Sequence, residues 1–297
     1  MAGIRQLRLG KQRAAWVEQF KPKAVKGDTL RASARIEGRY VAQWEKLVDT
    51  MGREVIREVR ALFESPEFAG QPGAAIAQDA SIASQARILL SKLSERFTLM
   101  FNRAARPMAE AMLAEVDKDA ARTLGRSLRE ASGTVTLPRL DFQTAALKEA
   151  ITASVAENVG LIRRIPERFL SDVQGAVMRS ITSGNGLSDL LPYMEKRYGE
   201  DKRHARNVAL DQTRKAYTSI NSERMKAVGV RKFEWVHTGG SQQPRKYHMD
   251  RWPAGLNGGI FSLDDPPVID ERTGERGLPG YAPFCRCTMR PVVSFDD

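Results

Sequence analysis

Two cysteines and two histidines near the C-terminus are the residues of this sequence best suited to chemistry. Cys285 and Cys287 are one residue apart, and His237 and His248 precede them. Two thiolates and two imidazoles would give zinc a closed tetrahedral shell, the arrangement of structural rather than catalytic sites. Successive side chains of a strand point to opposite faces, so both sulfurs can face one ion only from a turn or irregular segment. Pro283, just before the pair, favours such a segment.

Other interpretations of these residues remain open. The spacing does not match the common zinc-finger formulas. Buried thiols also pack as small hydrophobes, with the histidines as polar residues of a loop-rich domain. A disulfide between the two cysteines is disfavoured because so short a ring strains its geometry. A catalytic interpretation places His248, Asp250 and Asn257 near the cysteines, as in a metal-dependent nuclease or hydrolase.

Known catalytic motifs are missing from the sequence. It contains no P-loop, G-x-S-x-G elbow, H-E-x-x-H pair or dinucleotide fingerprint. We therefore expect no catalytic residues and no cofactor beyond structural zinc.

Short motifs follow one another in a defined order through the second half of the chain. The first are Asn158-Val-Gly-Leu-Ile-Arg-Arg-Ile-Pro166, Gly184-Asn-Gly186 and Ala209-Leu-Asp-Gln-Thr213, leading to Asn221 and Gly229. They are followed by Trp235-Val-His237, Pro244-Arg-Lys-Tyr-His248, Gly258-Gly-Ile-Phe261, Asp265-Pro266, Pro279-Gly280 and Cys285-Arg-Cys287. This order resembles the phage Mu F-like head morphogenesis family over residues 145 to 293, which is half of the chain. Where many members carry Arg-Thr-Glu, this chain has Asp211-Gln212-Thr213, so a role of that glutamate is not implied.

The resemblance implies a non-enzymatic minor head protein of a tailed phage. Such a protein would be capsid-internal or portal-associated and would act in head morphogenesis and in DNA packaging or ejection. The implied partners are the portal protein, the major capsid or scaffolding protein, and phage DNA bound non-specifically. The implied location is the virion, in the head interior or at the portal vertex, with the host cytoplasm during assembly and no membrane. The alternative is a metal-dependent nuclease or hydrolase, or a toxin-like enzyme, centred on the C-terminal domain.

The chain has a formal net charge of +11, which favours contact with polyanions such as nucleic acid. Contacts to phosphates through Arg and Lys would be independent of sequence and sensitive to salt. A spread of basic residues is also typical of solvated helix faces, and a basic terminus can simply be frayed. The candidate nucleic-acid contacts are Arg5, Arg8, Lys11, Arg13, Lys21 and Lys23 near the N-terminus, with Arg245 and Lys246 near the C-terminus.

The pattern of apolar residues predicts a predominantly α-helical elongated body followed by a small irregular α+β C-terminal domain. We expect breaks at three places along the body, two of them because proline normally ends or opens a helix. One lies near Ala105, one between Leu161 and Pro166, and one before a last long helix that begins at Arg203. Strands are predicted at Phe233 to His237, Ile260 to Leu263 and Met289 to Val293.

The length of the chain exceeds the usual range of one domain, and the composition changes along it. No stretch approaches the roughly twenty apolar residues that span a bilayer, and no signal peptide or disulfide framework is present. We therefore expect a soluble protein that is intracellular when made. The predicted divisions are a basic N-terminal arm (1–28), a long-helix region (29–133), a helical Mu F-like core (134–230) and a small Gly/Pro-rich domain with Cys-x-Cys (231–297).

Overall fold

The structure is a computed structural model that describes residues 24–66, 82–132, 140, 143–184, 186–239 and 244–294. Its helices are α2 (Ala34–Phe63), α4 (Ile82–Ser132), α5 (Ala145–Ser183), α6 (Leu187–Ala227) and the short α7 (Lys246–Met249). Its strands are β1 (Ala24–Lys26), β2 (Lys232–Val236), β3 (Ile260–Ser262), β4 (Val268–Asp270), β5 (Glu275–Arg276) and β6 (Thr288–Ser294). The predicted fold class, a helical body with a small α+β C-terminal part, is confirmed.

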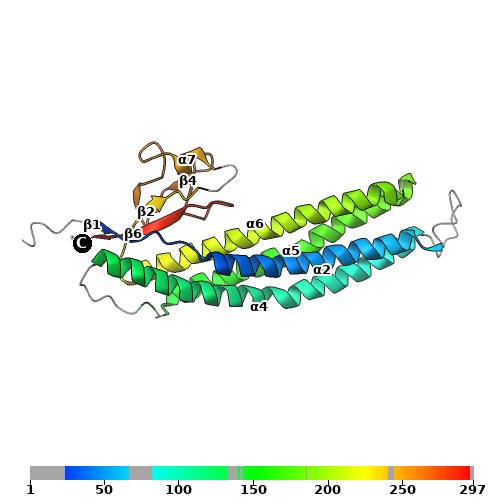
Figure 1. Cartoon of the computed structure of the whole chain (residues 1–297), viewed down its shortest axis with the longest axis horizontal. Helices are drawn as coiled ribbons and strands as arrows, with labels where there is room; N and C mark the ends of the chain where they lie inside the picture. Colours follow the sequence, from blue (N-terminus) through cyan, green and yellow to red (C-terminus); the bar gives the residue numbers. More distant parts are fainter. Residues whose placement is uncertain are drawn as a thin grey trace, which may run out of the picture.

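The four long helices lie side by side in an elongated bundle, and the sheet sits on it near one end (Figure 1). With 51 residues, α4 is about 75 Å long at the rise of an α-helix. In α2 the buried residues Tyr40, Trp44, Val48 and Met51 recur three or four positions apart, which places them on one face. The helices pack through aliphatic and aromatic faces of this kind. No helix of the described residues is both long enough and apolar enough to cross a bilayer.

The helices continue through three prolines, so the predicted breaks are wrong. Pro107 lies inside α4, Pro166 inside α5 and Pro192 inside α6. A proline inside a helix removes one backbone hydrogen bond and costs about 3 kcal/mol. In α4 the residues Ala105 and Ala109 on either side of the proline are fully buried. Packing of the same face before and after each proline outweighs the local cost.

A buried chain of polar side chains joins three helices of the bundle. The hydroxyl of Tyr40 on α2 donates to Oδ1 of Asn158 on α5 at 2.7 Å. Asn158 Nδ2 donates to Oε1 of Gln212 on α6 at 3.1 Å, and Gln212 Nε2 donates to Glu157 Oε1 at 2.8 Å. Because each group finds a partner, this chain fixes the relative positions of the helices without leaving an unpaired polar atom.

The sheet is antiparallel and has the strand order β1-β6-β2-β3. The three predicted strands are confirmed as β2, β3 and β6. β1 was not predicted, because residues 24–26 fall at the end of the range that we assigned to the basic arm. It pairs with β6 through Val25 opposite Val293. The sheet therefore joins the segment before α2 to the segment after α6.

The packing of α2 on α6 predicts that alanine has opposite effects on stability at two glycines of α2. A Cβ at Gly52 would lie 2.3 Å from Cδ2 and 3.0 Å from Cγ of Tyr198. The Tyr198 ring cannot swing away freely, because its hydroxyl donates to Asp49 at 2.5 Å. We therefore expect Gly52→Ala to lower the free energy of unfolding by about 1–3 kcal/mol, the cost of overpacking.

The same substitution at Gly38 is the control, because a Cβ there has no neighbour within 4 Å. Removing a glycine from an open helical position should raise stability by about 0.5–1 kcal/mol. Urea unfolding followed by circular dichroism measures both variants. Equal effects at the two positions would contradict the described packing of α2 on α6.

Candidate metal centre

The register of β2 on β6 brings one histidine to one cysteine. Val236, the last residue of β2, is opposite Thr288, the first residue of β6. His237 follows Val236 and Cys287 precedes Thr288, so the same antiparallel pairing, continued by one residue, places these two side by side. His237 Nδ1 lies 3.5 Å from Cys287 Sγ.

The second histidine comes from the short helix α7 and is almost fully buried, at 2% exposure. His248 Nδ1 lies 3.4 Å from Cys285 Sγ and 3.9 Å from Cys287 Sγ. Its other ring nitrogen, Nε2, is 2.8 Å from the carbonyl oxygen of Ile269 in β4. The ring of Trp235 meets it edge-on, with centroids 5.2 Å apart. Contacts on several sides therefore fix the orientation of the imidazole.

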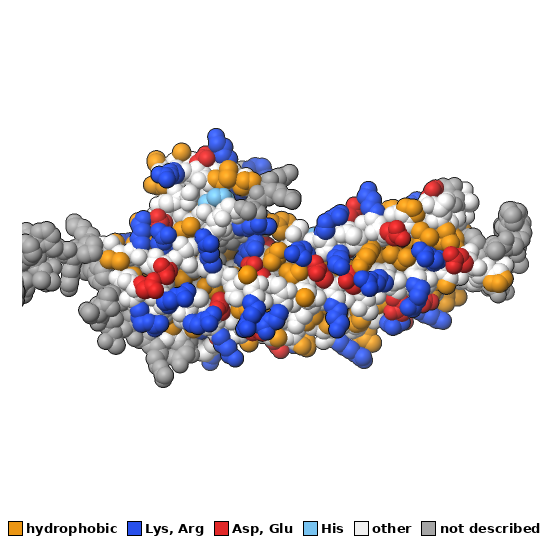
Figure 2. Space-filling model, viewed as in Figure 1, with side chains coloured by type: hydrophobic (Ala, Val, Ile, Leu, Met, Phe, Trp, Pro, Cys, Tyr) orange, Lys and Arg blue, Asp and Glu red, His pale blue; other side chains and the backbone are white. Residues whose placement is uncertain are grey.

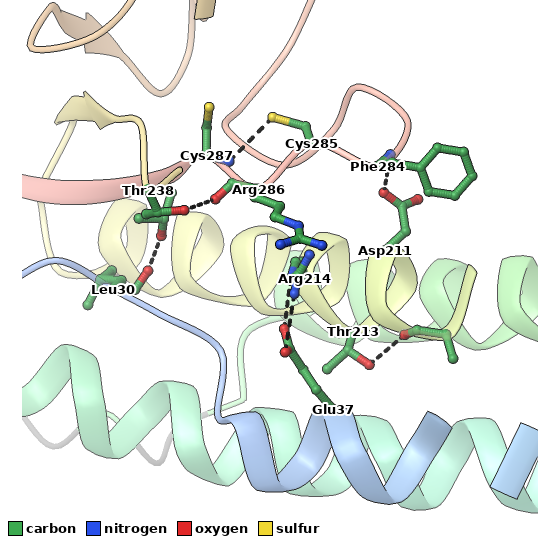
Figure 3. A network of polar contacts seen from close by, with 12 residues as sticks. Leu30, Glu37, Asp211, Thr213, Arg214, Thr238, Phe284, Cys285, Arg286 and Cys287 are labelled. Carbon is green, nitrogen blue, oxygen red and sulfur yellow. Dashed lines mark hydrogen bonds and ion pairs between the residues drawn. The ribbon is translucent and has the colours of Figure 1, made fainter. Parts of the chain in front are cut away.

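The cysteines lie on an irregular segment between a turn at Pro283 and Phe284 and the start of β6, as predicted from Pro283. Phe284 has a positive φ of 58°, which is uncommon for a residue with a side chain. Its backbone N–H donates to Oδ1 of Asp211 on α6 at 2.7 Å (Figure 3). The backbone N–H of Cys287 points to Cys285 Sγ at 3.4 Å. This turn allows both sulfurs to face the histidines, which a regular strand would prevent.

Further hydrogen bonds hold the cysteine segment from outside. Both Nη atoms of Arg245 donate to the carbonyl oxygen of Pro283, each at 3.2 Å. Thr238 Oγ1 donates to the carbonyl oxygen of Arg286 at 2.5 Å (Figure 3). Arg245 was predicted to contact nucleic acid and has this structural contact as well. Lys246 is exposed, with Nζ 3.9 Å from Asp250.

Cys285, Cys287 and His248 shift one another's pKa. The hydrogen bond with Cys287 lowers the pKa of Cys285 to about 4, burial acts in the opposite direction, and His248 adds to the lowering. The same pairing, together with burial, raises the pKa of Cys287. Burial lowers the pKa of His248, but its contacts with Cys285 and Ile269 outweigh burial and raise it. One thiolate of the pair is thus stabilised, and the thiolate is the form that binds metals.

Of the residues in the catalytic interpretation, only His248 belongs to the compact group of possible metal ligands. His248, Cys285 and Cys287 offer ligand atoms that all lie within 4.8 Å of one another. Asp250 is outside that set, and so is His237, which contacts Cys287. Asn257 Oδ1 accepts a hydrogen bond from the backbone N–H of His237 at 3.1 Å. Asn257 therefore helps to position a histidine.

Two features of the junction between sheet and bundle were missed by the sequence analysis. Asp211 is buried, and burial raises its pKa, although Lys215 at 3.2 Å and the amide of Phe284 act in the opposite direction. A cleft of about 330 Å³ is lined by Arg31, Arg214 and Arg286 among others. Nε of Arg214 lies 2.8 Å from Oε1 of Glu37 (Figure 3). No local pattern identifies either feature, because both depend on segments far apart in the sequence.

The six basic candidates near the N-terminus, Arg5, Arg8, Lys11, Arg13, Lys21 and Lys23, lie outside the described residues.

The contact between Asp211 and Phe284 can be tested by a pair of substitutions. Asp211→Ala removes the acceptor of a partly buried N–H, which costs about 1–3 kcal/mol. Asp211→Asn keeps an oxygen acceptor and should retain most of the contact. We expect faster hydrogen exchange of the Phe284 amide in the Ala variant than in the Asn variant.

Glu195→Ala, at an exposed position of the same helix, is the control. Unchanged exchange at Phe284 in Asp211→Ala would show that this hydrogen bond does not hold the cysteine segment on α6.

Comparison with known proteins gives one family and one relative. The family model described as Phage Mu protein F like protein matches residues 171–290. An uncharacterized protein of Haemophilus influenzae is 27% identical over 147 residues, which are 50% of this chain and 30% of that protein. This chain thus spans less than a third of the length of that relative. No solved structure matches the chain.

The matched range runs from within α5 through α6 into β6, and it contains both histidines and both cysteines of the candidate metal centre. The resemblance inferred from the order of the motifs is thereby confirmed: residues 171–290 of this chain are similar to the Phage Mu protein F like family.

Proposed function

We propose that this protein is a minor head protein of a tailed phage, located in the head interior or at the portal vertex, and that it acts in head morphogenesis. The observation that carries this proposal is the family match, which covers the last third of α5, all of α6, the strands β2 and β3, and the start of β6. The matched range is thus a coherent structural part of the molecule, in which α6 and the strands that follow it are in contact. The portal protein and the major capsid or scaffolding protein are the proposed partners.

The long bundle offers a lateral surface for such a partner. Ile88 and Leu99 on α4 are 55% and 49% exposed, which is high for large apolar side chains. They are 11 residues apart, about three helical turns, so they share one face of α4. Apolar side chains on a shared face are suited to packing against another protein. We place the contact with the portal or capsid on this face.

The basic charge of the chain supports a second role close to packaged DNA. Lys and Arg side chains are spread over the visible face of the bundle, interspersed with acidic ones (Figure 2). Arg31, Arg214 and Arg286 line the junction cleft together with Glu37, which pairs with Arg214. Cations of this kind bind phosphates without reading sequence. We propose non-specific DNA contact through the N-terminal basic residues and this cleft during packaging or ejection.

The surroundings of His248, the best catalytic candidate, support a non-enzymatic role. A general base must come within hydrogen-bonding reach of a substrate proton. His248 is buried, and its two ring nitrogens face the carbonyl oxygen of Ile269 and the cysteine sulfurs. A metal-dependent hydrolase is the alternative, and it predicts that His248→Ala abolishes a measurable turnover.

Quantitative peptide mass spectrometry of purified phage particles tests the proposed location. We expect this chain in particles at far fewer copies than the major capsid protein. Replacing Ile88 and Leu99 by Lys should reduce incorporation while the helical circular dichroism of the isolated protein stays unchanged. Ile88→Val with Leu99→Met is the control, because these changes keep the face apolar. Absence of the wild-type chain from particles would contradict the proposal.

The DNA contact is tested by binding to duplex DNA over a range of salt concentrations. Each lost phosphate contact should reduce the slope of log affinity against log salt by about 0.9. We expect a shallower slope when Arg5, Arg8 and Lys11 are replaced by Gln. An unchanged slope would exclude these three from the contact. The control variant removes the same charge from exposed positions of the bundle, at Lys46, Lys92 and Arg103.

A further inference from the structure

We propose that His237, His248, Cys285 and Cys287 bind one zinc ion as a closed structural site. The ion would join the end of β2, the helix α7 and the segment before β6.

The distances between ligand atoms agree with a tetrahedral zinc site. Zinc lies about 2.3 Å from a thiolate sulfur and about 2.0 Å from an imidazole nitrogen, so tetrahedral angles place sulfur and nitrogen about 3.5 Å apart. Sulfur and nitrogen are 3.4 Å apart for Cys285 with His248 and 3.5 Å apart for Cys287 with His237. The third distance, from Cys287 to His248, is 3.9 Å. Small side-chain shifts would bring all three to the expected value. His237 would have to move further, because it lies outside the group of ligand atoms that are all within 4.8 Å of one another.

The hydrogen bond of His248 directs the correct nitrogen toward the sulfurs. A carbonyl oxygen can only accept, so Nε2 carries the proton that is donated to Ile269. In the neutral ring Nδ1 then has a free lone pair, and Nδ1 is the atom that faces both cysteines. Metal-ligating histidines usually donate their other N–H to a carbonyl or carboxylate in this way.

The surroundings of the sulfurs favour a metal over simple packing. Cys285 and Cys287 are free thiols at 5% and 6% exposure. A cysteine that packs as a small hydrophobe needs only apolar neighbours. Here each sulfur instead lies against an imidazole nitrogen, and the two sulfurs face the same small volume. Three ligands from this group could also form an open, catalytic site, so the role of His237 decides between the two kinds of site.

A zinc ion would add stability to the sheet region. Apart from β2 and β6, the strands have two or three residues each, and loops connect them. Small regions of this kind gain much of their folding energy from a bound metal. The ion would fix the cysteine segment, and with it the amide of Phe284 that bonds to Asp211 on α6. Loss of the ion should therefore loosen the sheet region and leave the bundle folded.

Elemental analysis of the full chain, purified from zinc-containing medium, is the first test. We expect about one zinc per wild-type chain, as for a single four-ligand site. Zinc should fall to background in the double variant Cys285→Ser, Cys287→Ser and in His248→Ala. His248→Cys should retain zinc, because three cysteines and one histidine also form a structural site. His204→Ala is the matched control, since the third histidine of the chain lies on α6 and not among the proposed ligands.

Cobalt titration of the metal-free wild-type chain provides a readout that does not depend on how well the variants fold. We expect a thiolate-to-cobalt charge-transfer band that saturates at one equivalent, together with slower hydrogen exchange at residues 283–287 and unchanged exchange in the bundle. A wild-type chain with neither zinc nor this band would overturn the proposal, as would equal zinc in the cysteine variant and in His204→Ala. His237→Ala distinguishes the two kinds of site: loss of tight binding supports the closed one, and undiminished affinity rules it out.

Discussion

The antiparallel pairing of β6 between β1 and β2 is the constraint on which the rest of the C-terminal structure depends. β6 begins at the residue after Cys287, and β2 ends at the residue before His237. Because side chains alternate along a strand, a shift of this register by one residue would move every side chain of β6 to the other face. The position of one cysteine beside one histidine is thus set by the same hydrogen bonds that form the sheet.

The same pairing also connects the sheet to the bundle. β1 precedes α2, and β2 follows α6, so β6 pairs with strands that are next to two different helices in the sequence. The polar contacts at the junction act on the same segments, with Asp211 holding the amide of Phe284 and the hydroxyl of Ser219 lying 2.8 Å from that of Tyr281. The small sheet therefore gains order from the long helices, which have the larger apolar core.

Local patterns in the sequence predicted the helical body and three of the strands, because apolar periodicity is a property of neighbouring residues. They failed at Pro107 and Pro166, where burial of the helix face on both sides outweighs the local cost of proline. β1 was missed because a three-residue strand is defined by its partner, and that partner lies more than 260 residues away.

The candidate site was predictable in its residues and unpredictable in its geometry. Only two cysteines and three histidines are present, so residue types alone suggested the ligand set. The pairing of His237 with Cys287 and of His248 with Cys285 follows from the sheet register and from α7, which spacing does not reveal. At the position where the family often has glutamate, Thr213 is buried and donates to the carbonyl oxygen of Ala209 at 2.8 Å. That position serves packing within α6 in this chain.

The central claim is that His237, His248, Cys285 and Cys287 bind one zinc ion. X-ray absorption at the zinc edge, measured on the purified full chain, tests this claim most directly. The account predicts two sulfur ligands at about 2.3 Å and two nitrogen ligands at about 2.0 Å, with no further ligand in the first shell. A shell of oxygen and nitrogen without sulfur, or a protein without a zinc edge, would contradict it.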